Sequence, residues 1–350
     1  MARIAAIAPV LPGHAYAQNE ITATIAPLLT SDPRRLATIE RIHAATGIQT
    51  RHLVLPLDQY AGLSSFTLAN DIFIREGTSL AAQACRQTLT AAGLDAQDVD
   101  YLLVTTITGI ATPSLDVLLV EQLGLRPDVK RVPVFGLGCV AGAGGIARVR
   151  DYLQGHPQDV ALLVSVELCS LTLQHGDDSM ANIVSSGLFG DGATAVVMVG
   201  SDRVDDVPAG IDVVDSRSDI VPGTTDALGW DVGGSGFRIV LAASLADIVE
   251  RNLGPGVVDL LAAHGLKVAD VSTWVAHTGG PRILRAAASA LELPDEAFAA
   301  SWRSLARVGN LSSSASTCRT PDELRLPTRA SDRQLAANAS SGRPSARAAA

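Results

Sequence analysis

Three short apolar runs constrain the fold of this chain more than any other feature. They cover residues 101–106 (YLLVTT), 160–166 (VALLVSV) and 193–199 (ATAVVMV), and none alternates regularly with polar residues. Runs of this kind are typical of strands that are covered on both faces of a sheet. Patterns typical of helices lie around them at 79–92, 114–123 and 140–153. The sequence therefore predicts an α/β fold, with helices layered around a largely buried sheet.

A polar stretch holding Asp205, Asp206 and Pro208 divides the chain into two parts of similar α/β content. We expect one half over residues 1–204 and a second over 205–316. The elements expected in the second half are a strand near 211–214, a helix over 245–264, a strand over 273–276 and a helix over 282–291. With 47% apolar residues in a chain of 350, both halves can bury a core.

Charge and cysteine content exclude several classes of protein. The chain has 27 Lys and Arg against 36 Asp and Glu, a formal net charge of −9, so no nucleic-acid partner is expected. Its four cysteines are widely spaced and predict neither a disulfide framework nor a metal site. The longest apolar runs are the length of strands and too short to span a membrane. We expect a cytoplasmic protein.

The last 34 residues, 317–350, differ in composition from the rest of the chain. They contain 18 Ala, Arg or Ser residues and no Val, Ile, Phe, Trp, Tyr or Met. Their six Arg and three acidic residues sum to +3, whereas residues 1–316 sum to −12. A segment of this kind cannot supply buried central strands. We therefore expect a disordered tail and a second half that is incomplete at its C-terminal end.

Cys139 is the first candidate for chemistry. An apolar run ends in Gly136-Leu137-Gly138, the cysteine follows, and a helix of small residues begins. Glycines permit a sharp turn from strand to helix, and the positive end of a helix favours a thiolate. A lowered thiol pKa is what a nucleophilic cysteine needs. The alternative is an unreactive cysteine in a tight contact between helix and sheet.

His277 and Asn310 are the candidates for partners of this cysteine. His277 follows the expected strand 273–276 and precedes Gly279-Gly280-Pro281, so we expect it at the carboxyl end of a strand, where α/β sheets bind ligands. Asn310 follows a glycine just after an expected helix, and either residue could instead have a structural role. The remaining histidines lie in polar or loop-like contexts or end a helix: His14, His43, His52, His156, His175 and His264.

Taken together, these segments resemble the type III polyketide synthases, the chalcone-synthase-like branch of the thiolase superfamily. The matching motifs, in order, are LGLRP from Leu123, GCVAG at Cys139, SVELCSLT at Cys169, LFGDGA at Phe189, WVAHTGGP at His277 and GNLSS at Asn310. Their spacing agrees too, with 138 residues from Cys139 to His277 and 33 from His277 to Asn310. The actinobacterial members, including those that make alkylpyrones from fatty acyl-CoA, look most similar.

The resemblance implies a thiolase-like fold of two similar α/β halves in layers, and a homodimer. It implies an acyltransferase that condenses malonyl-CoA, with decarboxylation, onto an acyl-CoA starter, giving an alkylpyrone, a resorcinol or a related phenolic. Cys139 would carry the starter as a thioester, and His277 would hold it as a thiolate paired with an imidazolium. His277 and Asn310 would stabilise the enolate formed as CO2 leaves. No metal or redox cofactor is then needed, since CoA thioesters are the substrates.

Further residues match the substrate path of the family. Phe189 and Phe237 match two gatekeeper phenylalanines between the CoA tunnel and the cavity. Cys169 and Thr172 match cavity positions whose bulk sets starter size and chain length. Arg51 and Arg282 fall near positions that meet the CoA phosphates.

Two features depart from the family. Thr278 replaces the usual proline after the histidine, and the resemblance ends near Ser316, where the family continues with an apolar helix, two strands and a Gly-Pro-rich loop. Gly342 to Arg347 can be encoded by bases that, read one position earlier, give Gly-Pro-Ala-Phe-Ser-Ala. A frameshift near the serines that precede Thr317 is our hypothesis for the altered tail.

Three alternatives stay open from the sequence. The first is a ketoacyl synthase III-like enzyme that performs one condensation with an acyl-carrier protein in fatty acid synthesis. The second is a hydrolase, because a Cys, His and Asn set also suits papain-like proteases. The third is an inactive, truncated homologue, whose tail does not complete the second half.

Overall fold

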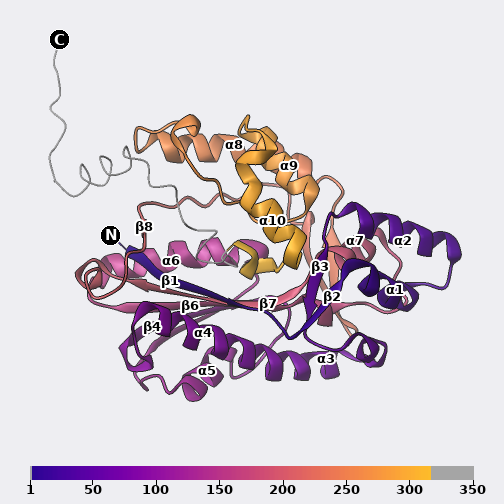
Figure 1. The fold of residues 1–350 in the computed structure, drawn as a ribbon, viewed down its shortest axis with the longest axis horizontal. Coiled ribbons are helices and arrows are strands. Elements are labelled where there is room, and N and C mark those ends of the chain that lie inside the picture. The colour runs from indigo at the N-terminus through magenta and orange to yellow at the C-terminus, as the bar shows by residue number, and fades with distance from the viewer. Residues whose placement is uncertain (1, 317–350) are drawn as a thin grey trace, which may run out of the picture.

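The computed structural model describes residues 2–316, and its largest element is a six-stranded sheet in the order β5-β4-β6-β7-β1-β8 (Figure 1). The strands are β1 (Ala2–Val10), β4 (Val99–Thr106), β5 (Lys130–Phe135), β6 (Val160–Leu168), β7 (Asp191–Val199) and β8 (Ile211–Val213). Strands β5, β4 and β6 run parallel, and β7 is antiparallel to both β6 and β1. The three strands predicted from apolar runs are confirmed as β4, β6 and β7.

Helices cover both faces of this sheet, with α4 and α5 on one side and α6 on the other (Figure 1). The helices are α4 (Thr78–Ala92), α5 (Leu115–Leu123) and α6 (Ala141–Gly155). Leu89 and Leu119 pack in the core on the first face, and Val149 and Leu153 of α6 pack on the second. Every residue of β6 and β7 is buried, as the absence of polar alternation predicts. The predicted α/β class and its buried sheet are therefore confirmed.

The second half lies over the α6 face of the sheet (Figure 1). Its elements are the hairpin β9 (Leu228–Gly233) and β10 (Gly236–Leu241), followed by α8 (Leu245–Ala262), α9 (Pro281–Ala290) and α10 (Ala299–Val308). The helices predicted over 245–264 and 282–291 are thus confirmed. Strand β8, expected near 211–214, pairs with β1 and so extends the sheet of the first half. The tail 317–350, with its predicted disorder and frameshift, lies outside the described residues.

The strand predicted over 273–276 is wrong, because residues 271–280 form neither strand nor helix. A strand needs a neighbour to complete its ladder of hydrogen bonds. Within the described residues the Ala276 amide donates instead to Ser301 Oγ of α10, at 3.0 Å. His277 is therefore held by a loop packed against a helix.

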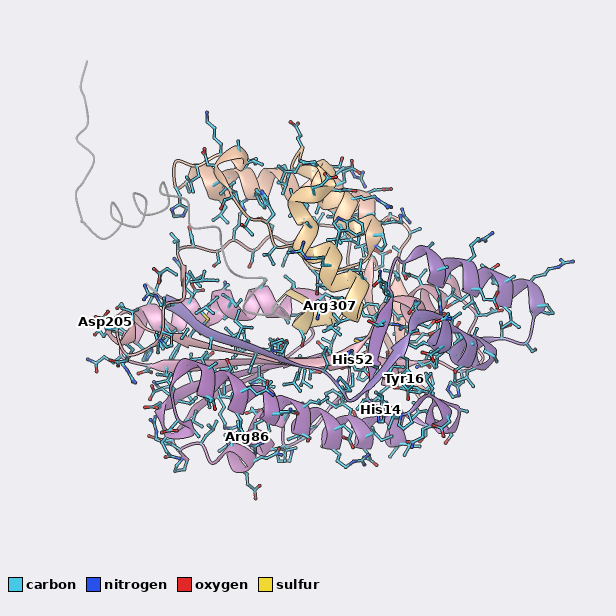
Figure 2. The ribbon with its side chains drawn as sticks, viewed as in Figure 1. His14, Tyr16, His52, Arg86, Asp205 and Arg307 are labelled. Carbon is cyan, nitrogen blue, oxygen red and sulfur yellow. The ribbon has the colours of Figure 1, made fainter. Side chains whose placement is uncertain are left out.

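A smaller unit packs at the edge of the first half. It consists of β2 (His14–Ala17), α1 (Gln18–Leu29), α2 (Pro33–Ala45), β3 (Thr50–Leu53), α3 (Phe66–Ile72) and α7 (Met180–Leu188). Figure 2 shows His14, Tyr16 and His52 together on the two-stranded antiparallel sheet of β2 and β3, where the rings of His14 and Tyr16 stack with centroids 6.4 Å apart. Among residues 2–316, no helix is both long and apolar enough to span a membrane.

Candidate active site

Cys139 lies at the sharp turn that the sequence predicts. Strand β5 ends at Phe135, a short 3-10 helix covers Gly138–Val140, and α6 begins at Ala141. Gly136 and Gly138 have φ values of +96° and +63°, in the region that glycine adopts without strain. The thiol is thus placed at the N-terminal end of α6, and the two glycines are what permit this turn.

The turn opens on a cavity of about 1080 Å³ with mostly apolar walls. Cys139, Phe189 and His277 all line it, as do Cys169 and Thr172. The second half closes the cavity with side chains that include Asp219, Leu245 and Val275. The structure therefore brings the predicted cysteine and histidine to one cavity between the halves, although they come from segments 138 residues apart.

His277 is a neutral imidazole in this cavity. Burial lowers its pKa to about 4, because a charged ring loses its hydration there. Its Nδ1 is buried without a hydrogen-bond partner among the described residues, so one ring nitrogen is free to exchange a proton.

Three other histidines lie outside the cavity lining: His14, His43 and His52. The ring of His43 contacts Thr22, Ser186 and the Ile183 carbonyl instead.

Asn310 is fixed directly behind the cavity wall. Its amide N–H donates to the Leu188 carbonyl at 2.9 Å, and its side-chain Oδ1 accepts from the Ser312 amide, also at 2.9 Å. Gly309 precedes it with φ at +73°, and a Cβ there would lie 2.8 Å from the Leu188 carbonyl oxygen. Phe189 and Ser312 beside it line the cavity, while Asn310 is 2% exposed.

The environment of Cys139 disfavours the predicted thiolate. Burial raises the pKa of Cys139 to about 11, and the nearby carboxylate of Glu167 adds to the rise. A helix N-terminus contributes only a fraction of a charge, which is smaller than the charge of an ionised Glu167 nearby, although burial raises the pKa of Glu167 itself. Since burial lowers the pKa of His277 as well, these surroundings favour a thiol and a neutral imidazole over the predicted ion pair.

Glu167 is the functional-site residue that sequence reasoning missed. It is fully buried at the end of β6 and accepts hydrogen bonds from two sides. Ser312 and Ser313 donate to Oε1, while Thr106, Thr108 and the Ile107 amide donate to Oε2. The sequence signal for this residue is a single glutamate inside the otherwise uncharged motif SVELCSLT. A buried acid needs hydrogen-bond donors around it, so such a glutamate indicates a polar network.

The remaining predicted residues are divided between the cavity and its surroundings. Phe237 is 3% exposed and packs against Phe66, Phe135 and Trp230, of which Phe135 and Trp230 line the cavity. Arg282 is exposed and donates to the Ala243 carbonyl at 3.4 Å.

Arg51 does not lie where the sequence places it. It is 2% exposed, and its guanidinium donates to Gln18 Oε1 at 2.9 Å and to the Phe189 carbonyl at 2.6 Å. The prediction that it meets CoA phosphates does not fit this burial. The side chain instead lines the same cavity as Cys139.

Fold and site together define a condensing enzyme of the thiolase type: a cavity between two halves, lined by a cysteine at a strand-to-helix turn and by a histidine of the second half. Sequence models of the chalcone and stilbene synthases match the chain, the N-terminal domain over residues 1–203 and the C-terminal domain over 212–335. The chain therefore belongs to the chalcone and stilbene synthase family, the type III polyketide synthases, which are acyltransferases. The second match continues beyond Ser316, where the sequence analysis ended the resemblance.

Individual relatives agree with this family. The chain is 51% identical, over 312 residues, to a 1,3,6,8-tetrahydroxynaphthalene synthase of Streptomyces peucetius, with 89% of this chain and 82% of the relative covered. It is 30% identical to the α-pyrone synthesis polyketide synthase-like Pks18 of Mycobacterium tuberculosis, with 89% and 80% covered. The crystal structure of the tetrahydroxynaphthalene synthase of Streptomyces coelicolor superposes with a TM-score of 0.82 at 30% identity, covering 90% of this chain and 88% of that one.

Proposed function

We propose that this protein builds a polyketide on Cys139 by repeated decarboxylative condensation of malonyl-CoA onto an acyl-CoA starter. The observation that carries the proposal is the placement of Cys139 and His277 on one mostly apolar cavity of about 1080 Å³. Such a cavity can hold an acyl chain and its extensions away from water. A relative at 51% identity named for tetrahydroxynaphthalene synthesis makes that aromatic product the first to test, ahead of an alkylpyrone.

The first step transfers the starter. The Cys139 thiol passes its proton to the neutral His277 imidazole while sulfur attacks the acyl carbon of the CoA thioester. The new S–C bond forms, the bond to CoA sulfur breaks, and the departing CoA thiolate takes a proton back. A neutral imidazole with a free ring nitrogen is the form of His277 that can accept this proton.

The second step forms the carbon–carbon bond. Malonyl-CoA loses CO2, and the carbon of the resulting enolate attacks the acyl carbon on Cys139. The bond from that carbon to the Cys139 sulfur breaks, and the sulfur leaves as a thiolate that takes a proton from solvent. The extended chain is then on CoA, and a repeat of the first step returns it to Cys139. The developing negative oxygen needs hydrogen-bond donors. Because Asn310 Oδ1 already accepts from the Ser312 amide, Nδ2 is the end of this side chain that can donate. We assign Asn310 Nδ2 and His277 to that task, and no metal or redox cofactor is required.

We infer further that the protein is a cytoplasmic homodimer, with β5 at the interface. Strand β5 is an edge of the sheet, and Val132 and Phe135 on it are 38% and 53% exposed. Exposed edge strands with apolar side chains are sites of association. Sedimentation of the wild-type chain and of Val132→Lys, a position on β5 that does not line the cavity, tests this, since a dimer that persists unchanged in the variant contradicts the β5 interface.

Product analysis tests the main proposal. The purified protein receives malonyl-CoA alone or with hexanoyl-CoA, without carrier protein, and products are identified by mass spectrometry. We expect a polyketide from the wild type and from Cys85→Ala, a matched control in the core of α4, and none from Cys139→Ala. Products that form only with acyl-carrier protein would support the ketoacyl synthase alternative instead.

A further inference from the structure

Three buried polar atoms that lack a partner in residues 2–316 belong to residues lining the cavity: Arg51 Nη2, Trp230 Nε1 and His277 Nδ1. All three nitrogens can be hydrogen-bond donors. A buried donor without an acceptor costs free energy. Three such donors on the residues of one cavity therefore point to a ligand with several oxygen acceptors. Among the described lining residues Arg51 is the only Arg or Lys, which makes it the strongest of the three.

Two hydrogen bonds fix the Arg51 guanidinium, and one of its nitrogens, Nη2, has no partner among the described residues. Its Nε donates to Gln18 Oε1 at 2.9 Å and its Nη1 to the Phe189 carbonyl at 2.6 Å, while Nη2 has no acceptor. Arg51 is 2% exposed, so bulk water does not solvate Nη2. A guanidinium fixed by two bonds loses little further entropy when it binds an oxygen.

Among the described residues Arg51 has no direct ion pair. Asp191 is the acid whose charge acts on it, but this carboxyl accepts from the Val54 amide and from both donors of Ser170. Tyr60 and Cys169 also face the guanidinium, and His43 lies near enough for Arg51 to lower its pKa. Burial lowers the pKa of Arg51 to about 10, which leaves it charged at neutral pH.

Arg51 and the nucleophile share Cys169 as a neighbour on the cavity wall. Cys169 is within electrostatic range of both Cys139 and Arg51, and all three line the cavity. The apolar residues Ile21, Ile25 and Leu53 form the wall in this region. In such surroundings a single fixed cation interacts strongly with a polarised oxygen.

We propose that Arg51 Nη2 binds the ketone and enolate oxygens of the growing chain and so positions it for further extension. This inference rests on the proposed function, because a chain with an oxygen on every second carbon arises only from repeated condensation. A β-dicarbonyl unit loses its central proton to solvent on forming an enolate, and a neighbouring cation favours that loss. A carboxylate of malonyl-CoA is the less suitable occupant, since a cation on it would stabilise the state before CO2 leaves.

The test uses 2,4-pentanedione as the probe and the Cys139→Ala protein, which cannot form a thioester. The absorbance of the enolate is titrated against pH for the bound and the free probe. We expect the pKa of the bound probe to fall by roughly one unit, which gives about tenfold more enolate at a given pH. In the double variant Cys139→Ala, Arg51→Gln, the pKa of the probe should return to its value in free solution. Arg41→Gln, on an exposed position of α2, is the matched control.

Arg51→Gln can fail to fold, because the Phe189 carbonyl loses its donor. A crystal structure of Cys139→Ala with 2,4-pentanedione then decides: a probe oxygen within hydrogen-bond distance of Nη2 supports the proposal, and an ordered water there, with the probe elsewhere, overturns it. Binding of malonate to Cys139→Ala, with no binding of pentanedione, also overturns the proposal. Acylation of wild-type Cys139 by hexanoyl-CoA is measured separately, so failure of the proposed function is distinguished from failure of this site.

Discussion

The sulfur of Cys139 lies 3.6 Å from Ser312 Oγ, and Ser312 Oγ in turn donates to Glu167 Oε1 at 3.4 Å. Ser312 has one hydroxyl hydrogen, so while that hydrogen points at Glu167 the thiol must be the donor in its contact with Ser312. The carboxylate therefore acts on the nucleophile through one intervening hydroxyl. Burial is the largest cause of the raised pKa of Cys139, and the charge of Glu167 acts in the same direction, whereas a hydrogen bond donated by Ser312 would lower it. With the Ser312 hydrogen directed at Glu167, that lowering is lost.

The first prediction concerns the reaction of Cys139 with iodoacetamide. Since its pKa is raised to about 11, the alkylation rate should climb continuously with pH from 7 to beyond 9. Mass spectrometry of the Cys139 peptide gives the rate at each pH. A plateau between pH 6 and 8 would instead indicate a preformed thiolate paired with imidazolium, and would contradict the neutral pair.

The second prediction concerns Glu167→Gln. Removing the negative charge should lower the pKa of Cys139 by roughly half a unit to one unit, which speeds alkylation at pH 8 about three- to tenfold. The hydroxyls of Ser312 and Ser313 can reverse their roles and accept from the new amide, so the packing is preserved. Asp219→Asn, a change of the same kind on another wall of the cavity, is the control. An unchanged or slower rate in Glu167→Gln would contradict this effect of the Glu167 charge.

The sequence identifies the two cavity-lining residues Cys139 and His277 because each bears a local signature. Gly136 and Gly138 mark a turn, and Gly-Gly-Pro after His277 marks the start of α9. What the sequence cannot convey is the surrounding charge. Burial and the distance from Cys139 to Glu167 arise only when β6, the α6 turn and the segment after Asn310 meet, and they reverse the predicted thiol pKa.

Two other failures have the same origin in tertiary contacts. Residues 273–276 have the composition of a strand, yet Ala276 bonds to Ser301 of α10 because, within residues 2–316, no strand lies beside it. Arg51, as a lone arginine between polar neighbours, is expected at a surface. The α1 and α7 helices close over it, and its partners Gln18 and Phe189 lie 33 and 138 residues away along the chain.

The third prediction concerns the size of the product. Thr172 lines the cavity, and its hydroxyl donates to the Cys169 carbonyl at 2.8 Å. Thr172→Phe should fill part of the cavity and shift the products toward fewer condensations, with the consumption of malonyl-CoA per product falling in parallel. Thr172→Val removes the hydroxyl at nearly constant volume and should keep the wild-type chain length. Equal product lengths in the Phe and Val variants would exclude a role for volume at this position.

The fourth prediction concerns stability at acidic pH and the buried ring of His43. This ring is 1% exposed, and burial lowers its pKa to about 4, below the ordinary value of 6.5. As the pH falls from about 6.5 to 4, the unfolded chain therefore binds a proton that the folded chain does not. The free energy of unfolding should decrease over this window, with a contribution from His43 of up to about 1.4 kcal/mol per pH unit.

A comparison of variants isolates this contribution. His277 acts in the same direction, whereas Asp191, whose pKa is raised to about 6 by burial, stabilises the fold as the pH falls toward 3.8. Urea unfolding from pH 7 to 4.5 should give a shallower pH dependence for His43→Gln than for the wild type. His14→Gln, on the exposed end of β2, controls for the loss of an imidazole. Parallel pH curves for the wild type and His43→Gln would show that His43 is protonated in the folded chain.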